Sequence, residues 1–98
     1  MLEFAIRDED DEEFEIPGEE WKRVLVPKSF SFEVIDDPEA FLRLKVVDHI
    51  LNFSPEPVGI LIHFETSETD REIAKQIVTE ILENAETFTG KKGKLIEY

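Results

Sequence analysis

The sequence contains no cysteine, four glycines, and only one methionine, one tryptophan and one tyrosine. Without cysteine the chain cannot form a disulfide, a thiolate metal site or a cysteine nucleophile, so its fold depends on packing. Its longest apolar run, residues 58–62, is far shorter than the roughly 20 residues that a membrane-spanning helix needs. The N-terminus has neither the basic region nor the apolar region of a secretory signal. We therefore expect a cytoplasmic protein that makes no membrane contact.

Amide side chains are also scarce, at two asparagines and one glutamine, whereas glutamate, lysine and isoleucine are abundant. This bias is typical of thermostable proteins. The length of 98 residues suits one domain with one core.

Acidic charge is the strongest feature that the sequence does have. The chain holds 24 acidic and 11 basic side chains, a net charge of −13, and residues 1–20 alone contain ten acids and one base. Such a field repels phosphates, so we expect no direct binding to nucleic acid or to an anionic membrane surface. Basic proteins and cations are the partners that this charge favours.

Six consecutive acids follow the first predicted strand, and their mutual repulsion predicts a mobile, solvated loop over residues 8–13. The same side chains are the first candidates for contact with a basic partner. They are Asp8, Glu9, Asp10, Asp11, Glu12 and Glu13.

Part of this run matches a calcium-binding loop, which makes Ca²⁺ or Mg²⁺ binding an alternative function. Positions 1, 3, 5 and 12 of the loop pattern correspond to Asp8, Asp10, Glu12 and Glu19. Position 6 is Glu13, where the sharp turn of an EF-hand needs glycine, and Pro17-Gly18 interrupts the following segment. An EF-hand is therefore disfavoured, and looser divalent-cation binding or no cofactor remains.

Alternation of apolar and polar residues and the positions of turn residues predict most of the strands. The residues before the acidic run alternate with a period of two, and the apolar run before His63 is typical of a central strand. The predicted strands are 2–7, 21–26, 30–35 and 58–64, with a short edge strand at 14–16 and a terminal hairpin of 86–89 and 94–98.

Two helices are predicted, over residues 38–53 and 70–84. The first begins at an Asp-Asp-Pro-Glu sequence that suits a helix start, although residues 42–46 also alternate cleanly as a strand would. The second begins at a capping box formed by Thr69 and Glu72 and continues with apolar residues at helical spacing.

The first predicted helix has a second apolar face in addition to the one that the core would need. If the sheet does not cover this face, it can bind a partner or a second copy of the chain. Its residues are Leu42, Val46, Ile50 and Phe53.

His63 is the best candidate for a catalytic side chain, because it ends the central strand just before Glu65. No nucleophile or metal-binding motif accompanies it, so a structural role for His63 is favoured over general acid-base catalysis. A small enzyme that uses His63 and nearby carboxylates therefore remains a third hypothesis.

Together these patterns predict an α+β two-layer sandwich, with a mostly antiparallel sheet of five or six strands and two helices on one face. The favoured function is a non-catalytic interaction or regulatory module. In it, the acidic segment binds a basic protein partner and the first helix pairs with a partner or forms a homo-oligomer.

Overall fold

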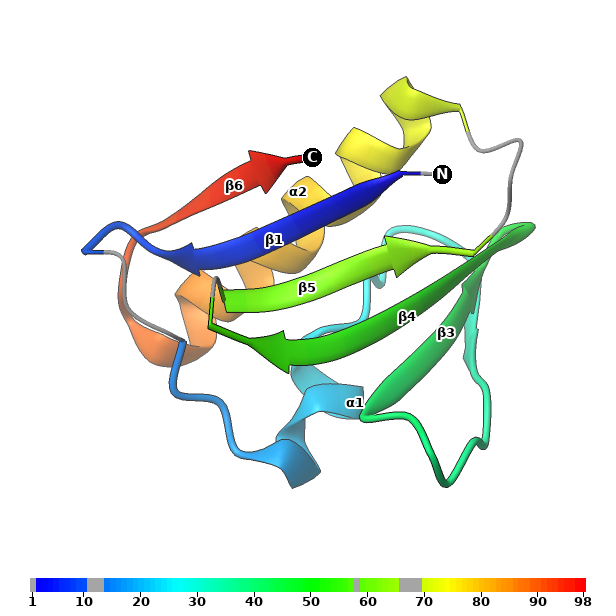
Figure 1. Cartoon of the computed structure of the whole chain (residues 1–98), viewed down its shortest axis with the longest axis horizontal. Helices are drawn as coiled ribbons and strands as arrows, with labels where there is room; N and C mark the ends of the chain where they lie inside the picture. The colour runs from blue at the N-terminus through cyan, green and yellow to red at the C-terminus, as the bar shows by residue number, and fades with distance from the viewer. Residues whose placement is uncertain (1, 11–13, 58, 66–69) are drawn as a thin grey trace.

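The computed structural model describes residues 2–10, 14–57, 59–65 and 70–98. In these residues a six-stranded antiparallel sheet has the order β2-β3-β4-β5-β1-β6, and two helices cover one of its faces (Figure 1). The predicted α+β two-layer sandwich is confirmed. The elements are β1 (Glu3–Asp8), the 3₁₀ turn η1 (Gly18–Glu20), α1 (Trp21–Val24), β2 (Phe32–Val34), β3 (Leu42–Val46), β4 (His49–Glu56), β5 (Gly59–Phe64), α2 (Arg71–Thr89) and β6 (Gly93–Glu97).

The strongest sequence patterns gave correct elements. The alternating residues at the N-terminus form β1, and the apolar run forms β5, which lies inside the sheet between β4 and β1. The C-terminal strand is confirmed as β6, which pairs with β1. The predicted second helix is α2, but its N-cap is Asp70, whose side chain accepts a hydrogen bond from the Glu72 amide at 2.8 Å. Thr69 lies outside the described residues.

The predicted helix over residues 38–53 is wrong. The segment forms strands β3 and β4, joined by the two-residue turn Val47-Asp48, and Leu44 lies opposite Leu51 in this hairpin. The alternation of residues 42–46 therefore predicted the structure better than the helix-start sequence did. The helix-start sequence instead forms a turn over residues 37–40, in which the Ala40 amide donates to the Asp37 carbonyl at 3.1 Å.

Three of the predicted strands are wrong as well. Residues 21–26, predicted as a strand, contain the short helix α1, because Trp21, Val24 and Leu25 at helical spacing all point into the core. Residues 14–16 are irregular, although both apolar side chains there are buried. Residues 86–89 are the last turn of α2, which ends where Gly90 adopts a left-handed conformation with φ of 73°.

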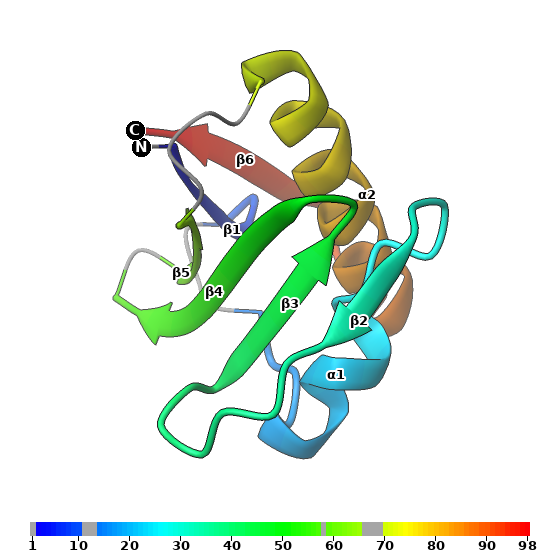
Figure 2. The ribbon, with the colours of Figure 1, turned by 90° about the vertical axis from the view of Figure 1, so that its right-hand side faces the viewer.

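One hydrophobic layer lies between the sheet and the helices. From the sheet it takes alternate residues of the strands, such as Leu44 and Phe53, and from α2 it takes the face that carries Ile77 and Ile81. Figure 2 shows α1 and α2 on the same side of the sheet, with α1 nearest to β2 and β3. The chain before and within α1 covers the part of the sheet that α2 does not reach.

In the described part of the chain, no helix is both long and apolar enough to cross a membrane.

The β3–β4 turn contains the feature of the backbone that is hardest to foresee. Val47 has a φ of 57°, a left-handed conformation that a β-branched side chain adopts only at a steric cost.

We predict that Val47→Gly raises the free energy of unfolding by about 1 kcal/mol. Val34→Gly is the control, because Val34 lies in a strand with ordinary φ and loses stability on the same change. Chemical denaturation of both variants measures the difference, and a less stable Val47→Gly protein would contradict the assignment of strain.

Candidate functional site

The predicted acidic loop is only partly a loop. Asp8 is the last residue of β1 and is 1% exposed, so its prediction as an accessible loop residue is wrong. One Asp8 carboxylate oxygen accepts a hydrogen bond from the Asp10 amide at 2.9 Å, and the other lies 3.8 Å from Lys91 Nζ. Glu9 and Asp10 are exposed. Asp11, Glu12 and Glu13 lie outside the described residues.

The described residues of the calcium-loop pattern do not support a calcium-binding loop. Asp8 is buried in β1 and Glu19 lies in the 3₁₀ turn η1, while Glu12 is outside the described residues. In the described ranges, no group of three or more histidine or acidic side chains is arranged to hold a metal ion. Cation binding by this segment stays a prediction.

The predicted apolar face of the first helix does not exist, because its residues lie in strands. Leu42, Val46 and Phe53 point into the core and are almost completely buried, and Ile50 is half-buried. The expectation of an apolar surface made of these residues is therefore corrected, and three of them stabilise the sheet instead.

His63 and Glu65 lie on the face of the sheet away from the helices, but they do not pair with each other. The His63 Nδ1 atom is 3.6 Å from a carboxylate oxygen of Glu3, its neighbour across the β1–β5 ladder. Glu65 instead holds Arg43 on β3. The nearby carboxylate that the structure gives His63 is thus Glu3, and acid-base catalysis by His63 stays a prediction.

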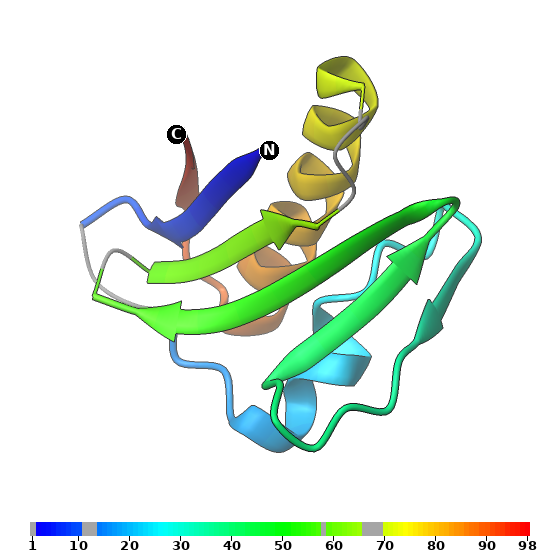
Figure 3. The same cartoon turned by 45° about the vertical axis from the view of Figure 1, so that its right-hand side comes forward.

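The candidate site is an open pocket of about 450 Å³ that lies beside the β2 edge of the sheet. One wall comes from η1 and α1, through Gly18, Glu19 and Lys22. The other wall comes from the end of β2, the β2–β3 loop and the start of β3. We call this the β2–α1 pocket, and Figure 3 shows β2 and the loop that follows it at the outer edge of the sheet.

The β2–α1 pocket offers apolar surface to a partner. Phe41 is 65% exposed and Val34 is 45% exposed, and both line the pocket. The Trp21 ring packs against the Phe41 ring, with ring centroids 5.8 Å apart. The Trp21 indole N–H in turn donates to the Ile16 carbonyl at 3.0 Å, so the ring that supports Phe41 has a fixed position.

Acidic side chains surround this apolar surface. Glu19 on η1 and Asp36 and Asp37 on the β2–β3 loop line the pocket, together with the basic side chains of Lys22 and Arg43. Residues 29–42 contain four acids and no lysine or arginine. The local charge is therefore negative, and it favours a cationic ligand.

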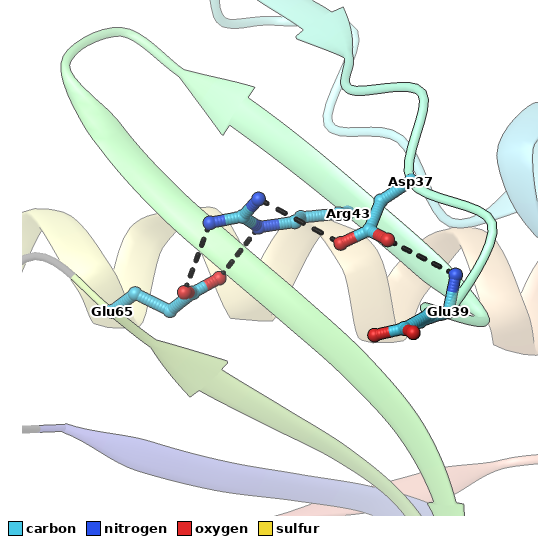
Figure 4. Close-up of polar contacts among 4 residues, drawn as sticks. All are labelled: Asp37, Glu39, Arg43 and Glu65. Atoms are coloured by element: carbon cyan, nitrogen blue, oxygen red, sulfur yellow. Dashed lines mark hydrogen bonds and ion pairs between the residues drawn. The ribbon is translucent and has the colours of Figure 1, made fainter.

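Arg43 fixes the β2–β3 loop to the sheet (Figure 4). Its guanidinium donates two hydrogen bonds to the Glu65 carboxylate, at 2.8 and 3.0 Å, and lies 3.7 Å from Asp37 on the loop. The hydrogen bond to Glu65 and its charge raise the pKa of Arg43 above the usual value, so the guanidinium stays positive at any physiological pH. Asp37 also accepts a hydrogen bond from the Glu39 amide at 3.0 Å, which shapes the loop.

Sequence reasoning did not find this site. Trp21 and Phe41 are 20 positions apart, and the sequence placed Trp21 in a strand and Phe41 in a helix, whereas the structure has Trp21 in α1 and Phe41 in the β2–β3 loop. The absence of basic residues over 29–42 was a usable signal, because it places unbalanced acids beside exposed apolar residues. The denser acidic run at the N-terminus is the stronger signal in the sequence, and it does not line the pocket in the described residues.

Comparison of the chain with protein-family models, with curated proteins and with solved structures finds no match in any of the three. The pocket must therefore be interpreted from its own chemistry.

We predict that Arg43→Lys loosens the β2–β3 loop without unfolding the protein. A lysine cannot make the bidentate hydrogen bonds to the Glu65 carboxylate while also reaching Asp37. Amide hydrogen exchange at Ile35 and Ala40 should become faster by about three- to tenfold. Arg23→Lys is the matched control, since Arg23 makes an exposed pair with Glu20 and the exchange at the loop should not change. Equal exchange in both variants would show that Arg43 does not hold the loop.

Proposed function

We propose that this protein is a non-catalytic interaction module of the cytoplasm, and that it binds a basic segment of a partner protein at the β2–α1 pocket. The observation that carries the proposal is the exposed Phe41, held by Trp21 and surrounded by Glu19, Asp36 and Asp37. An aromatic anchor inside a polar rim is the usual composition of a protein-binding surface.

The charge of the chain supports a basic partner over other macromolecules. At a net charge of −13, long-range repulsion opposes approach to nucleic acid and to anionic lipid. The same repulsion opposes contact between two copies of the chain. A basic protein segment is attracted at long range and can place lysine or arginine against the acids of the rim.

The N-terminal acids have a different role in this proposal. Figure 1 shows that the C-terminal end of β1 lies far from the loop between β2 and β3, and Glu9 and Asp10 directly follow β1 in the sequence. They therefore add to the field that attracts a basic partner, but they do not line the pocket. Substitutions of Glu9 and Asp10 therefore change the net charge of the protein without changing contacts in the pocket.

Two double variants with the same net charge test the proposal. The rim variant carries Glu19→Gln and Asp36→Asn, and the remote variant carries Glu9→Gln and Asp10→Asn, so each one changes the charge from −13 to −11. All four side chains are exposed, and both variants should fold normally. Asp37 is left unchanged because its carboxylate shapes the loop.

The measurement is affinity selection from a display library of random 12-residue peptides, at low and at moderate salt. We expect the wild type to enrich peptides that combine lysine or arginine with an apolar residue. The remote variant should enrich the same peptides, whereas the rim variant should bind them about tenfold more weakly, because two charge-assisted contacts are lost.

Three outcomes would contradict the proposal. The first is that the wild type enriches no peptides, and the second is that it enriches uncharged or acidic ones. Equal weakening by the rim and remote variants would show that the binding follows net charge alone, and that the pocket is not the site.

A further inference from the structure

The outer edge of β2 carries backbone groups that can bond to another strand. The Ile35 amide donates to the Arg43 carbonyl and the Val47 amide donates to the Ser31 carbonyl, both at 2.8 Å. In an antiparallel ladder the residues that bond to the neighbour alternate with residues that point away from it. Glu33 therefore bonds toward β3, whereas the amides and carbonyls of Phe32 and Val34 point away from the sheet.

The side chains around this edge are accessible. Phe32 is 36% exposed and Val34 is 45% exposed, on the face of the sheet that also carries the core. Glu33 is exposed on the opposite face. Among the described residues, the structure gives the outward backbone groups of Phe32 and Val34 no hydrogen-bond partner.

We propose that β2 accepts a basic, extended segment of the partner protein as an additional strand, which continues into the β2–α1 pocket. This inference rests on the proposed function and adds the mode of binding to it. Strand addition supplies affinity through main-chain hydrogen bonds and specificity through alternate side chains. The three residues of β2 allow only a short ladder, so the pocket at its end provides the remaining contact.

The faces of β2 define the sequence of the segment that fits. On one face the new strand would lie beside Phe32 and Val34, where apolar side chains pair well. On the other face it would lie beside Glu33, where lysine or arginine is favoured. Because side chains alternate along a strand, the best segment alternates apolar and basic residues.

A second copy of the chain is the competing occupant. The opposite edge strand, β6, contains Lys94 and directly follows Lys91 and Lys92, so it could in principle meet the acidic β2 edge of a neighbour. Each copy carries a net charge of −13, however, so two copies repel each other at long range. Charge complementarity therefore selects a separate basic segment.

The probe for this inference is an acetylated and amidated peptide of seven residues, Lys-Val-Lys-Phe-Lys-Val-Lys. Its binding is followed by the fluorescence of Trp21, the only tryptophan, which packs against Phe41 in the pocket. Two N-methylated versions keep every side chain and charge. One is methylated at the apolar residues, whose N–H groups face β2 in antiparallel addition, and the other at the two inner lysines, whose N–H groups face away.

Two variants of the protein test the same hydrogen bonds from the other side. Val34→Pro removes the outward N–H but no bond of the β2–β3 ladder, and proline is tolerated at such edge positions. Val34→Ala shortens the side chain and keeps the N–H. Both variants should give the melting temperature and amide spectrum of a folded sheet, which excludes unfolding as the cause of any loss.

We expect Val34→Pro to weaken peptide binding about tenfold and Val34→Ala by less than about threefold. Methylation at the apolar residues should abolish binding, whereas methylation at the lysines should preserve it. Equal affinities of the two methylated peptides, or of the two variants, would overturn strand addition. Self-association of the protein that Val34→Pro prevents would also overturn it, by identifying a second copy as the occupant.

The two proposals fail in distinguishable ways. If basic peptides bind and lose affinity in the rim variant but not in Val34→Pro, the module function stands and strand addition is wrong. If neither the library nor the probe binds, the proposed function itself is wrong.

Discussion

The structure depends on covering one face of a six-stranded sheet, which the single long helix α2 cannot cover alone. α2 packs across the part of the sheet that contains β6, β1 and β5, as Figures 1 and 3 show. The apolar residues of β3 would otherwise face water, so the chain before β2 has to cover them. Trp21 and Val24 of α1 do so, and both are buried. The hydrogen bond from the Trp21 indole to the Ile16 carbonyl fixes this short segment in place.

The same constraint produces the pocket. Because α1 has only four residues, it covers the core side of β3 but leaves Phe32 and Val34 of β2 exposed. The β2–β3 loop then extends past α1 and carries Phe41 against Trp21, while Arg43 joins the loop to Glu65 on the far side of the sheet. Core packing thus positions one wall of the pocket, and an ion-pair network positions the other.

The architecture was predictable wherever a pattern was long and unambiguous. The alternation in β1, the apolar run of β5 and the helical spacing of α2 each led to the correct element, and the fold class followed from them. The β3–β4 hairpin was missed for a physical reason: its turn is Val47-Asp48, without the glycine or asparagine that usually allows a positive φ. Without a turn signal, the apolar residues of two strands were combined into one helix.

The candidate site was less predictable, because it depends on where the misassigned segments lie. The acids and the exposed aromatic residue are visible in the sequence, but their proximity follows from the packing of Trp21 and the pairing of Arg43 with Glu65. The described residues of the densest acidic run, Asp8 to Asp10, do not line the pocket, and Asp8 is buried at the end of β1. Charge density alone therefore predicted a basic partner but did not predict the candidate site.

The most direct test of the account is amide hydrogen exchange along residues 32–35, measured with and without the peptide Lys-Val-Lys-Phe-Lys-Val-Lys. In the free protein, the account predicts slow exchange at Glu33 and Ile35, which bond to β3, and fast exchange at Phe32 and Val34. With bound peptide, exchange at Phe32 and Val34 should slow while the other two amides change little. Bound peptide that leaves Phe32 and Val34 exchanging as before would contradict the account.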